Sequence, residues 1–396
     1  MKILVVLPRF PYPLDKGDKL RAYHQIAELA KRHEIYLFAL SHSPFSTFHF
    51  PLSTEQVRLH WWESATGIIK AFLTGKPLQL GYWSSRRARR TYTHWERQVQ
   101  PDVVYCQMVR TIPTLNTKHL SPSTKYVLDF QDALSLNTQR RMERSHGPLR
   151  WILNYEYRAL QRTEQQALRL FDATTVISQT DRDAISPKVN IVPNGVDTDY
   201  FNVDKMISSH DNVSTYQRIN VSTYSIVFTG NMSYAPNVDA AQYLIKEIMP
   251  FVWSQVPSAT VLLAGADPKP AVKALAGPKV TVSGRLDDIR QAYSSAKVFV
   301  APMRIGSGMQ NKLLEAMSMG LPCVTTSIAA TPLGATPGEH LLVGDTAEEI
   351  ADLIVKLGSD ELHNSIADGG HHFVLEHYSW PAAVAQLEKI LLIPKP

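Results

Sequence analysis

The chain has 396 residues, of which 44% are hydrophobic and 19% are charged, a composition typical of a globular protein large enough for two domains. No apolar run approaches the roughly 18–20 residues that a membrane-spanning helix needs, and the first apolar stretch, interrupted by Pro8, is too short for a signal peptide. Cys106 and Cys323 have no metal-binding spacing, so we expect a cytoplasmic protein with two ordinary thiols.

Positive charge is concentrated in one part of the sequence. The net charge is +5, but the segment from Arg58 to Arg169 holds 18 Lys and Arg against 8 Asp and Glu, a net charge of +10. Its densest part is RRARR at 86–90. Such a segment suggests an anionic partner, namely phosphate, anionic lipid or nucleic acid, although a solvated basic face explains it equally well.

Strands alternate with helices from one end of the chain to the other. The first half predicts helices over 20–32 and 151–171 and strands over 3–7, 34–40, 103–106, 126–130, 173–178 and 189–193. The second half predicts helices over 236–253, 347–357 and 381–391 and strands over 225–230, 259–265, 279–284, 297–302 and 322–326. Repeated β-α units of this kind predict parallel sheets in two doubly wound α/β domains.

A polar stretch separates the two halves. We expect an N-terminal domain over 1–200, a linker over 201–224, a second domain over 225–375 and a C-terminal helix within 376–396 that crosses back to the first domain. Ligands of open α/β sheets bind at the carboxyl ends of the strands, so a cleft between the two domains is the expected site.

The segment RIGSGMQNKLLEAMSMGLPCV at 304–324 follows the strand predicted over 297–302 and predicts a glycine-rich turn and a helix. Ser307 is a suitable N-cap, and Gln310 completes an S-x-x-Q capping box. Lys312 and Glu315 fall outside the apolar stripe of the helix. A free helix N-terminus with a nearby lysine favours an anion such as phosphate, while an ordinary capped helix with a solvated Lys and Glu is equally compatible.

Together these segments resemble a family of enzymes. The resemblance rests on the segments PLDKGDKLRAY, TTVISQTDRDAI, VPNGVDTDYF, FTGNMSYAPNVDAAQYL and RIGSGMQNKLLEAMSMGLPCVTT. Over nearly its whole length the chain resembles the GT-B-fold retaining glycosyltransferases of family four, and among them the bacterial enzymes of exopolysaccharide and cell-surface glycan assembly. The resemblance implies two Rossmann-like domains that face each other across a cleft. It also implies sugar transfer from a nucleotide-sugar.

The resemblance also implies roles for particular residues. Catalytic roles fall on Asp132, Lys312 and Arg304, and Lys16, Lys19 and Arg21 would bind the acceptor. Donor binding falls on Gly17, Gly230, Asn231, Arg285, Leu286, Ser307, Gly308, Met309, Gln310, Asn311, Lys312 and Glu315. Many relatives have a carboxylate at the position of Ser307 and a histidine at that of Gln131. We therefore expect retention by same-face transfer, in which the departing diphosphate oxygen deprotonates the acceptor.

No cofactor or metal is expected, and a UDP- or GDP-sugar would be the donor substrate. The D-x-D sequences at 181–183 and 197–199 favour caps and turns over metal binding. The expected acceptor is a glycan or a lipid-linked molecule, with a possible peripheral contact to an anionic membrane and no nucleic acid. The alternatives are a nucleotide-sugar epimerase of the same architecture and a non-catalytic basic protein that binds membranes.

Overall fold

The computed structural model describes residues 1–14, 17–42, 52–117, 120–143, 145–208, 224–305 and 309–395. The chain divides into two compact units, of which unit 1 comprises Met1–Asn194 and Ala383–Pro396 and unit 2 comprises Gly195–Ala382. The sequence-based borders at 200, 225 and 376 lie near this division and stay predictions. Most of the predicted linker, residues 209–223, lies outside the described residues.

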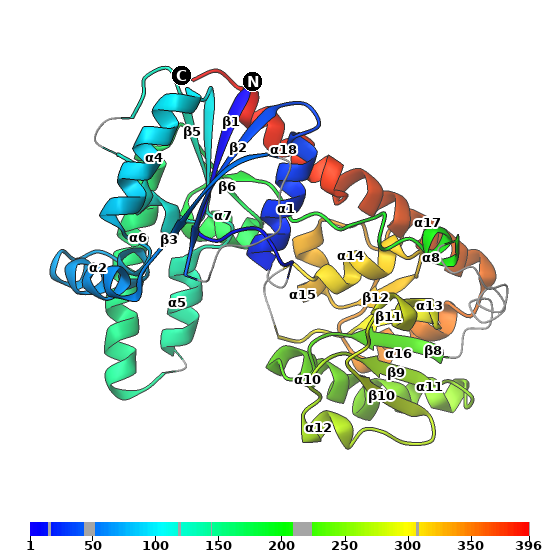
Figure 1. The fold of residues 1–396 in the computed structure, drawn as a ribbon. Helices are drawn as coiled ribbons and strands as arrows, with labels where there is room; N and C mark the ends of the chain where they lie inside the picture. The colour runs from blue at the N-terminus through cyan, green and yellow to red at the C-terminus, as the bar shows by residue number, and fades with distance from the viewer. Residues whose placement is uncertain are drawn as a thin grey trace. The chain divides into compact units, whose positions relative to one another are not determined.

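Unit 1 is built on a parallel sheet of seven strands in the order β3-β2-β1-β4-β5-β6-β7 (Figure 1). The strands are β1 (Lys2–Leu7), β2 (Glu34–Ser41), β3 (Ser53–Arg58), β4 (Val103–Gln107), β5 (Lys125–Asp129), β6 (Ala173–Val176) and β7 (Asn190–Ile191). The helices are α1 (Gly17–Leu29), α2 (Trp61–Leu73), α3 (Leu78–Tyr82), α4 (Arg86–Val99), the 3-10 helix η1 (Val109–Thr114), α5 (Leu134–Glu143), α6 (Gly147–Leu170) and α7 (Gln179–Ile185).

Helices cover both faces of this sheet, because successive side chains of a strand point to opposite faces. One face packs on α4 and α6 through side chains such as Tyr92 and Leu160. The other packs on α1 and on the last helix, α18 (Trp380–Leu392), through side chains such as Ile26 and Leu387. The end of α18 therefore belongs to the core of unit 1.

Unit 2 contains a parallel sheet of six strands in the order β10-β9-β8-β11-β12-β13. The strands are β8 (Tyr224–Thr229), β9 (Val261–Ala264), β10 (Val280–Gly284), β11 (Ala296–Ala301), β12 (Cys323–Thr325) and β13 (Leu342–Val343). The helices are α8 (Val203–Ser208), α10 (Ala235–Tyr243), the π-helix η2 (Leu244–Ile248), α11 (Met249–Gln255), α12 (Pro270–Lys273), α13 (Arg290–Ser294), α14 (Asn311–Ser318), α15 (Ser327–Ala330), the 3-10 helix η3 (Thr331–Leu333), α16 (Ala347–Lys356) and α17 (Asp360–His377). The prediction of two doubly wound α/β domains is confirmed.

The structure differs from the predicted elements at a few places. The strands β3 and β13 and the helices α2, α4, α5 and α17 are among the elements that were not predicted. The helix predicted over 236–253 is broken by η2, because Pro250, at the start of α11, has no N–H to donate to the preceding turn. Helix α6 begins at Gly147, with Pro148 in its first turn, four residues before the predicted start.

Candidate functional site

In unit 2 the predicted strand-turn-helix is β11 followed by α14, but the helix begins later than expected. Its first residue is Asn311, and Gln310 is the N-cap. The prediction that Ser307 caps this helix is therefore wrong, since the chain becomes helical only four residues further on. Ser307 and Gly308 themselves lie outside the described residues.

Lys312 lies in the first turn of α14 and points its partly buried ammonium group at neutral groups. Nζ donates to Asn237 Oδ1 at 2.5 Å, lies 3.9 Å from Met303 Sδ and sits 4.8 Å above the ring of Phe228. Among the described residues, no carboxylate forms an ion pair with it. Burial lowers the pKa of Lys312 to about 8, and the charge of Glu315 opposes this only in part.

Glu315 lies one turn further along α14 and belongs to a chain of hydrogen bonds. The hydroxyl of Tyr293, from α13, donates to Glu315 Oε2 at 2.7 Å and lies 2.9 Å from Thr229 Oγ1 at the end of β8. Burial raises the pKa of Glu315, while the Tyr293 hydrogen bond and the Lys312 charge lower it. The chain fixes this carboxylate beside Lys312, where it was predicted to bind the ribose of the donor.

Gly230 and Asn231 follow β8 and pack against Asn237, the partner of Lys312. The backbone of Gly230 has φ 155°, and a Cβ there would lie 2.7 Å from Asn237 Nδ2. Asn237 Nδ2 donates to the carbonyl of Asn231 at 2.9 Å. Asn237 therefore ties the β8 turn to Lys312, a role that the sequence analysis did not assign.

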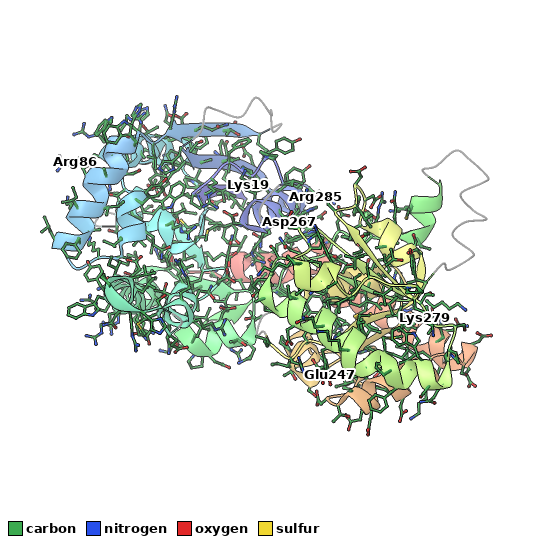
Figure 2. All side chains as sticks on the ribbon, turned by 90° about the horizontal axis from the view of Figure 1, so that it is seen from below. Lys19, Arg86, Glu247, Asp267, Lys279 and Arg285 are labelled. Atoms are coloured by element: carbon green, nitrogen blue, oxygen red, sulfur yellow. The ribbon has the colours of Figure 1, made fainter. Side chains whose placement is uncertain are left out.

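The remaining donor-binding residues of unit 2 surround the same edge of the sheet. Arg285 is exposed after β10 and is labelled in Figure 2, while Leu286 packs on the core of unit 2. Met309 and Gln310 are partly buried ahead of α14, and Asn311 is exposed. Their donor-binding roles remain predictions.

Arg304, predicted to act on the diphosphate, is already paired with carboxylates. Its guanidinium group lies 2.8 Å from Asp239 and 3.4 Å from Glu247, above the ring of Tyr243. The hydrogen bond with Asp239 raises the pKa of Arg304. Arg304 would have to give up these ion pairs to neutralise a ligand, so Lys312 is the better-placed cation.

In unit 1 the prediction that Arg21 binds the acceptor is wrong. Its side chain is 2% exposed and its donors are used within the protein. Nε donates to Asp129 Oδ2 at 2.7 Å, and the other nitrogens donate to the carbonyls of Val192 and Pro193 and to Asn194 Oδ1. Arg21 is a structural cation that holds the chain after β7 to the buried carboxylate of Asp129 at the end of β5.

Asp132 follows β5, three residues after Asp129. Burial raises the pKa of Asp132 to about 6, and the negative charges of Asp181 and Asp129 add to the effect, against Arg21 and Arg110. A carboxyl group with this pKa exchanges a proton close to neutral pH, which suits catalysis. Gln131, where relatives often have histidine, is buried with φ 62° and donates to Gln107 Oε1 at 3.3 Å.

The other unit 1 residues lie at the start of α1. Gly17 is exposed, and a Cβ there would meet no atom within 4 Å, so the protein itself does not require glycine at this position. Lys19 is partly buried in the first turn and is labelled in Figure 2. Lys16, also predicted to bind the acceptor, lies outside the described residues.

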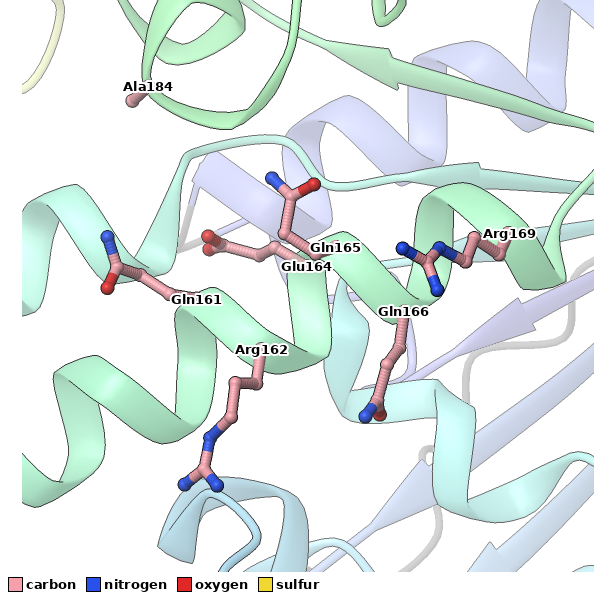
Figure 3. Close-up of a pocket in the computed structure, with 7 residues that line it drawn as sticks. All are labelled: Gln161, Arg162, Glu164, Gln165, Gln166, Arg169 and Ala184. Atoms are coloured by element: carbon pink, nitrogen blue, oxygen red, sulfur yellow. The ribbon is translucent and has the colours of Figure 1, made fainter.

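Two cavities on unit 1 are lined by other residues. One, of about 380 Å³, is lined by Gln161, Arg162, Glu164, Gln165, Gln166 and Arg169 of α6 and by Ala184 of α7 (Figure 3). The other, of about 560 Å³, lies near the end of α4, around Gln100 and Asp102. In the described part of the chain no group of three or more His, Cys, Asp or Glu could hold a metal ion. None of its helices is long and apolar enough to cross a membrane.

Comparison with known structures identifies the fold as GT-B. The chain is similar to sucrose-phosphate synthase from Thermosynechococcus elongatus, with 15% identity, a TM-score of 0.66 and coverage of 98% of each chain. It is similar to HepE from Anabaena in complex with UDP and glucose, with 15% identity, a TM-score of 0.60 and coverage of 99% of each chain. The GT-B fold that the resemblance implied is thereby confirmed.

Sequence comparison supports the same class of protein. Residues 223–360 match the model of the family described as glycosyl transferases group 1. The chain is 26% identical over 207 residues to the phosphatidyl-myo-inositol mannosyltransferase of Mycobacterium leprae, covering 50% of this chain and 52% of that protein. It is 22% identical over 173 residues to an uncharacterized 44.6 kDa protein in the cps region of Klebsiella pneumoniae, covering 41% and 45%. The chain thus spans about half the length of the curated relatives that it matches.

Proposed function

We propose that this chain is a glycosyltransferase that moves a hexosyl group from a nucleotide-sugar to a hydroxyl of a glycan, lipid-linked or other acceptor. The observation that carries the proposal is Lys312, a partly buried cation beside the N-terminus of α14 whose ammonium group contacts the neutral groups of Asn237, Met303 and Phe228. A diphosphate there would supply the missing negative charge. Glu315, which accepts a hydrogen bond from Tyr293, would accept the two ribose hydroxyls of the nucleotide.

The proposed reaction retains the anomeric configuration and needs no metal. The bond between the sugar C1 and the β-phosphate oxygen breaks, and a bond from C1 to the acceptor oxygen forms on the same face. The acceptor proton passes to the departing diphosphate, whose growing negative charge Lys312 and the N–H groups of α14 stabilise. Asp132 would orient the acceptor or stabilise the positive sugar.

Nucleotide binding by unit 2 gives the first test. We expect a nucleoside diphosphate at 100 times its dissociation constant to add about 2.7 kcal/mol to the stability of the protein, seen as a raised melting temperature. UDP is the first probe, with GDP and ADP alongside, since UDP-bound HepE shares the fold. A melting temperature that none of the three nucleotides or their sugars moves would remove the basis of the proposal.

The anomeric configuration of the product tests the mechanism. With the donor and an acceptor, NMR of the product should show the configuration of the donor sugar. Ser307→Ala should keep substantial activity, because Ser307 is not the nucleophile. An inverted product, or a folded Ser307→Ala protein without activity, would contradict same-face transfer.

The main alternative is a nucleotide-sugar epimerase with the same architecture. Such an enzyme converts a UDP-sugar without any acceptor, so incubation with the donor alone separates the two activities. A new sugar released under these conditions would favour the epimerase. Product formed only when an acceptor is present would favour the transferase.

A second part of the proposal is that unit 1 touches an anionic membrane from the cytoplasmic side. Near the basic segment, large aromatic side chains are exposed to solvent, with Trp61 80%, Phe72 60% and Trp151 82% exposed. Helices α2 and α6 meet there, since Tyr155 of α6 donates to the carbonyl of Ala71 at 3.1 Å. The exposed basic residues of α4 nearby include Arg86, Arg89 and Arg90, of which Arg86 is labelled in Figure 2.

Vesicle flotation tests this contact. We expect recovery on anionic vesicles at low salt, loss of most binding at high salt, and little recovery on neutral vesicles, since each Lys or Arg near such a surface contributes about 1 kcal/mol. Trp151→Ser should weaken the binding that remains at high salt, because an apolar contact is not screened. Equal recovery on neutral and anionic vesicles would show that the charge is incidental. Binding without any donor turnover would favour the non-catalytic alternative.

A further inference from the structure

Four neighbouring strands of unit 1 are each followed closely by a residue with an ionisable side chain. The order β2-β1-β4-β5 is parallel throughout, so the carboxyl ends of these strands form one edge of the sheet. His42 follows β2, Arg9 follows β1, Arg110 follows β4 and Asp132 follows β5, each within three residues of its strand. This edge is where open α/β sheets bind their ligands.

An aromatic shelf lies at one end of this edge. The ring of His42 stacks on Tyr82, with centroids 4.5 Å apart, and meets Trp83 edge-on at 4.6 Å. The guanidinium carbon of Arg9 lies 5.7 Å from the ring centroid of Trp83. Tyr82 is 39% exposed, so part of the shelf is open to a ligand. Aromatic rings of this kind can pack against the apolar face of a sugar ring.

Two arginines, Arg9 and Arg110, lie at the same edge. Arg9 is paired with Asp18 at 2.8 Å. Arg110 is partly buried, and its guanidinium group contacts neutral groups: Nε donates to Gln79 Oε1 at 3.1 Å, and Nη1 lies 4.0 Å from Met108 Sδ. No carboxylate of the described residues forms an ion pair with Arg110. Burial lowers the pKa of Arg110 and the nearby charge of Arg9 lowers it further, while the charges of Asp18 and Asp132 oppose this only in part.

We propose that this edge of unit 1 binds a phosphorylated sugar as the acceptor, with the sugar ring on the shelf of Tyr82 and His42 and the phosphate held by Arg9 and Arg110. Arginine suits this task because its planar fork binds two phosphate oxygens at once. The inference rests on the proposed glycosyltransferase function and names its acceptor class. Arg9 and Arg110 take the place of Arg21, which is buried and engaged elsewhere.

A phosphate beside a sugar can come from a soluble sugar phosphate or from a lipid-linked sugar pyrophosphate. Two probes separate these sources, namely glucose 1-phosphate and glucose carrying a hexyl pyrophosphate at C1. Methyl glucoside is the uncharged control. All are titrated by calorimetry in the presence of saturating nucleotide, so that the phosphates cannot enter the site beside Lys312.

We expect at least one charged probe to bind wild-type protein, and Arg110→Gln to weaken that binding at least tenfold. Arg9→Gln should have a similar effect, and Tyr82→Ala should weaken a phosphosugar more than inorganic phosphate. The matched control is Arg169→Gln, which removes an exposed arginine at the end of α6 and should change nothing. Preference for the hexyl probe would identify a lipid-linked source, and preference for glucose 1-phosphate a soluble one.

The proposal is overturned when neither charged probe binds wild-type protein that is saturated with nucleotide, or when Arg110→Gln binds them as wild type does. Methyl glucoside binding as tightly as the charged probes would overturn it too. Failure of the proposed function is recognised separately, since the protein would then bind none of the nucleotides. Circular dichroism of each variant excludes loss of folding as the cause.

Discussion

Lys312→Ala is expected to weaken nucleoside diphosphate binding by about 1.5–3 kcal/mol, or roughly 10- to 150-fold, because it removes a charge-assisted contact to phosphate. The ammonium group lies among neutral groups, namely the Asn237 oxygen, the Met303 sulfur and the Phe228 ring. Among the described residues no carboxylate forms an ion pair with this group, so a bound phosphate would not have to break one. Calorimetry with UDP measures the change, and unchanged affinity would remove Lys312 from the site.

The same residue gives nucleotide binding a pH dependence of known sign. In the free protein the pKa of Lys312 is about 8, so the side chain loses its proton as the pH rises above that value. A bound diphosphate favours the charged form, and its own last ionisation, near pH 6, is already complete. Binding above pH 8 must therefore take up a proton, and affinity should fall by up to about tenfold per pH unit in the wild type.

A matched control separates this effect from general alkaline weakening. Lys246→Ala removes an exposed lysine from the same unit and should bind UDP like the wild type at every pH. Lys312→Ala should show weak binding that changes little between pH 7 and pH 9. A wild-type affinity that stays constant over this range would mean that Lys312 is not the group that meets the diphosphate.

The strand-turn-helix around Lys312 could be predicted because its signals are local. An apolar strand, a glycine-rich turn and an apolar stripe with Lys312 and Glu315 outside it all lie within 30 residues of sequence. The start of the helix was predicted wrongly. Ser307 and Gln310 fit a capping box, but the chain becomes helical only at Asn311, since cap residues are equally suited to turns.

The partners of the site residues could not be predicted, since they come from distant parts of the chain. Asn237 is 75 residues from Lys312, and Asp129 is 108 residues from Arg21. In sequence, Arg21 resembles a surface cation beside Lys19, and only the folded sheet shows that its partner is a buried carboxylate. Arg110 could not be predicted as a site residue either, because it belongs to no recognisable sequence motif.

Asp132→Asn is expected to lower kcat by about 10²–10⁴-fold if Asp132 works as a general acid or base, and by less if it only positions the acceptor. The substitution keeps the shape of the side chain but removes its charge. In the wild type the pKa of Asp132 is about 6, so activity that needs the carboxylate should fall as the pH drops below 6. The Asn variant should lack this inflection. A variant with wild-type kcat would show that Asp132 only lines the site.

The same substitution should make the protein more stable, which a purely structural residue would not do. Folding raises the pKa of Asp132 from 3.8 to about 6, so the folded state binds more protons than the unfolded state between these values, and its stability falls as the pH rises through them. Above pH 6 Asp132 is ionised in the folded protein, although burial and the charges of Asp181 and Asp129 destabilise the ionised form. Removing its charge should then add about 1–3 kcal/mol at pH 8 and nothing near pH 4. Urea unfolding of both proteins at the two pH values measures this difference. Equal stability at pH 8 would mean that Asp132 is solvated and under no such strain, whereas a more stable and less active variant would mark it as a residue kept for function.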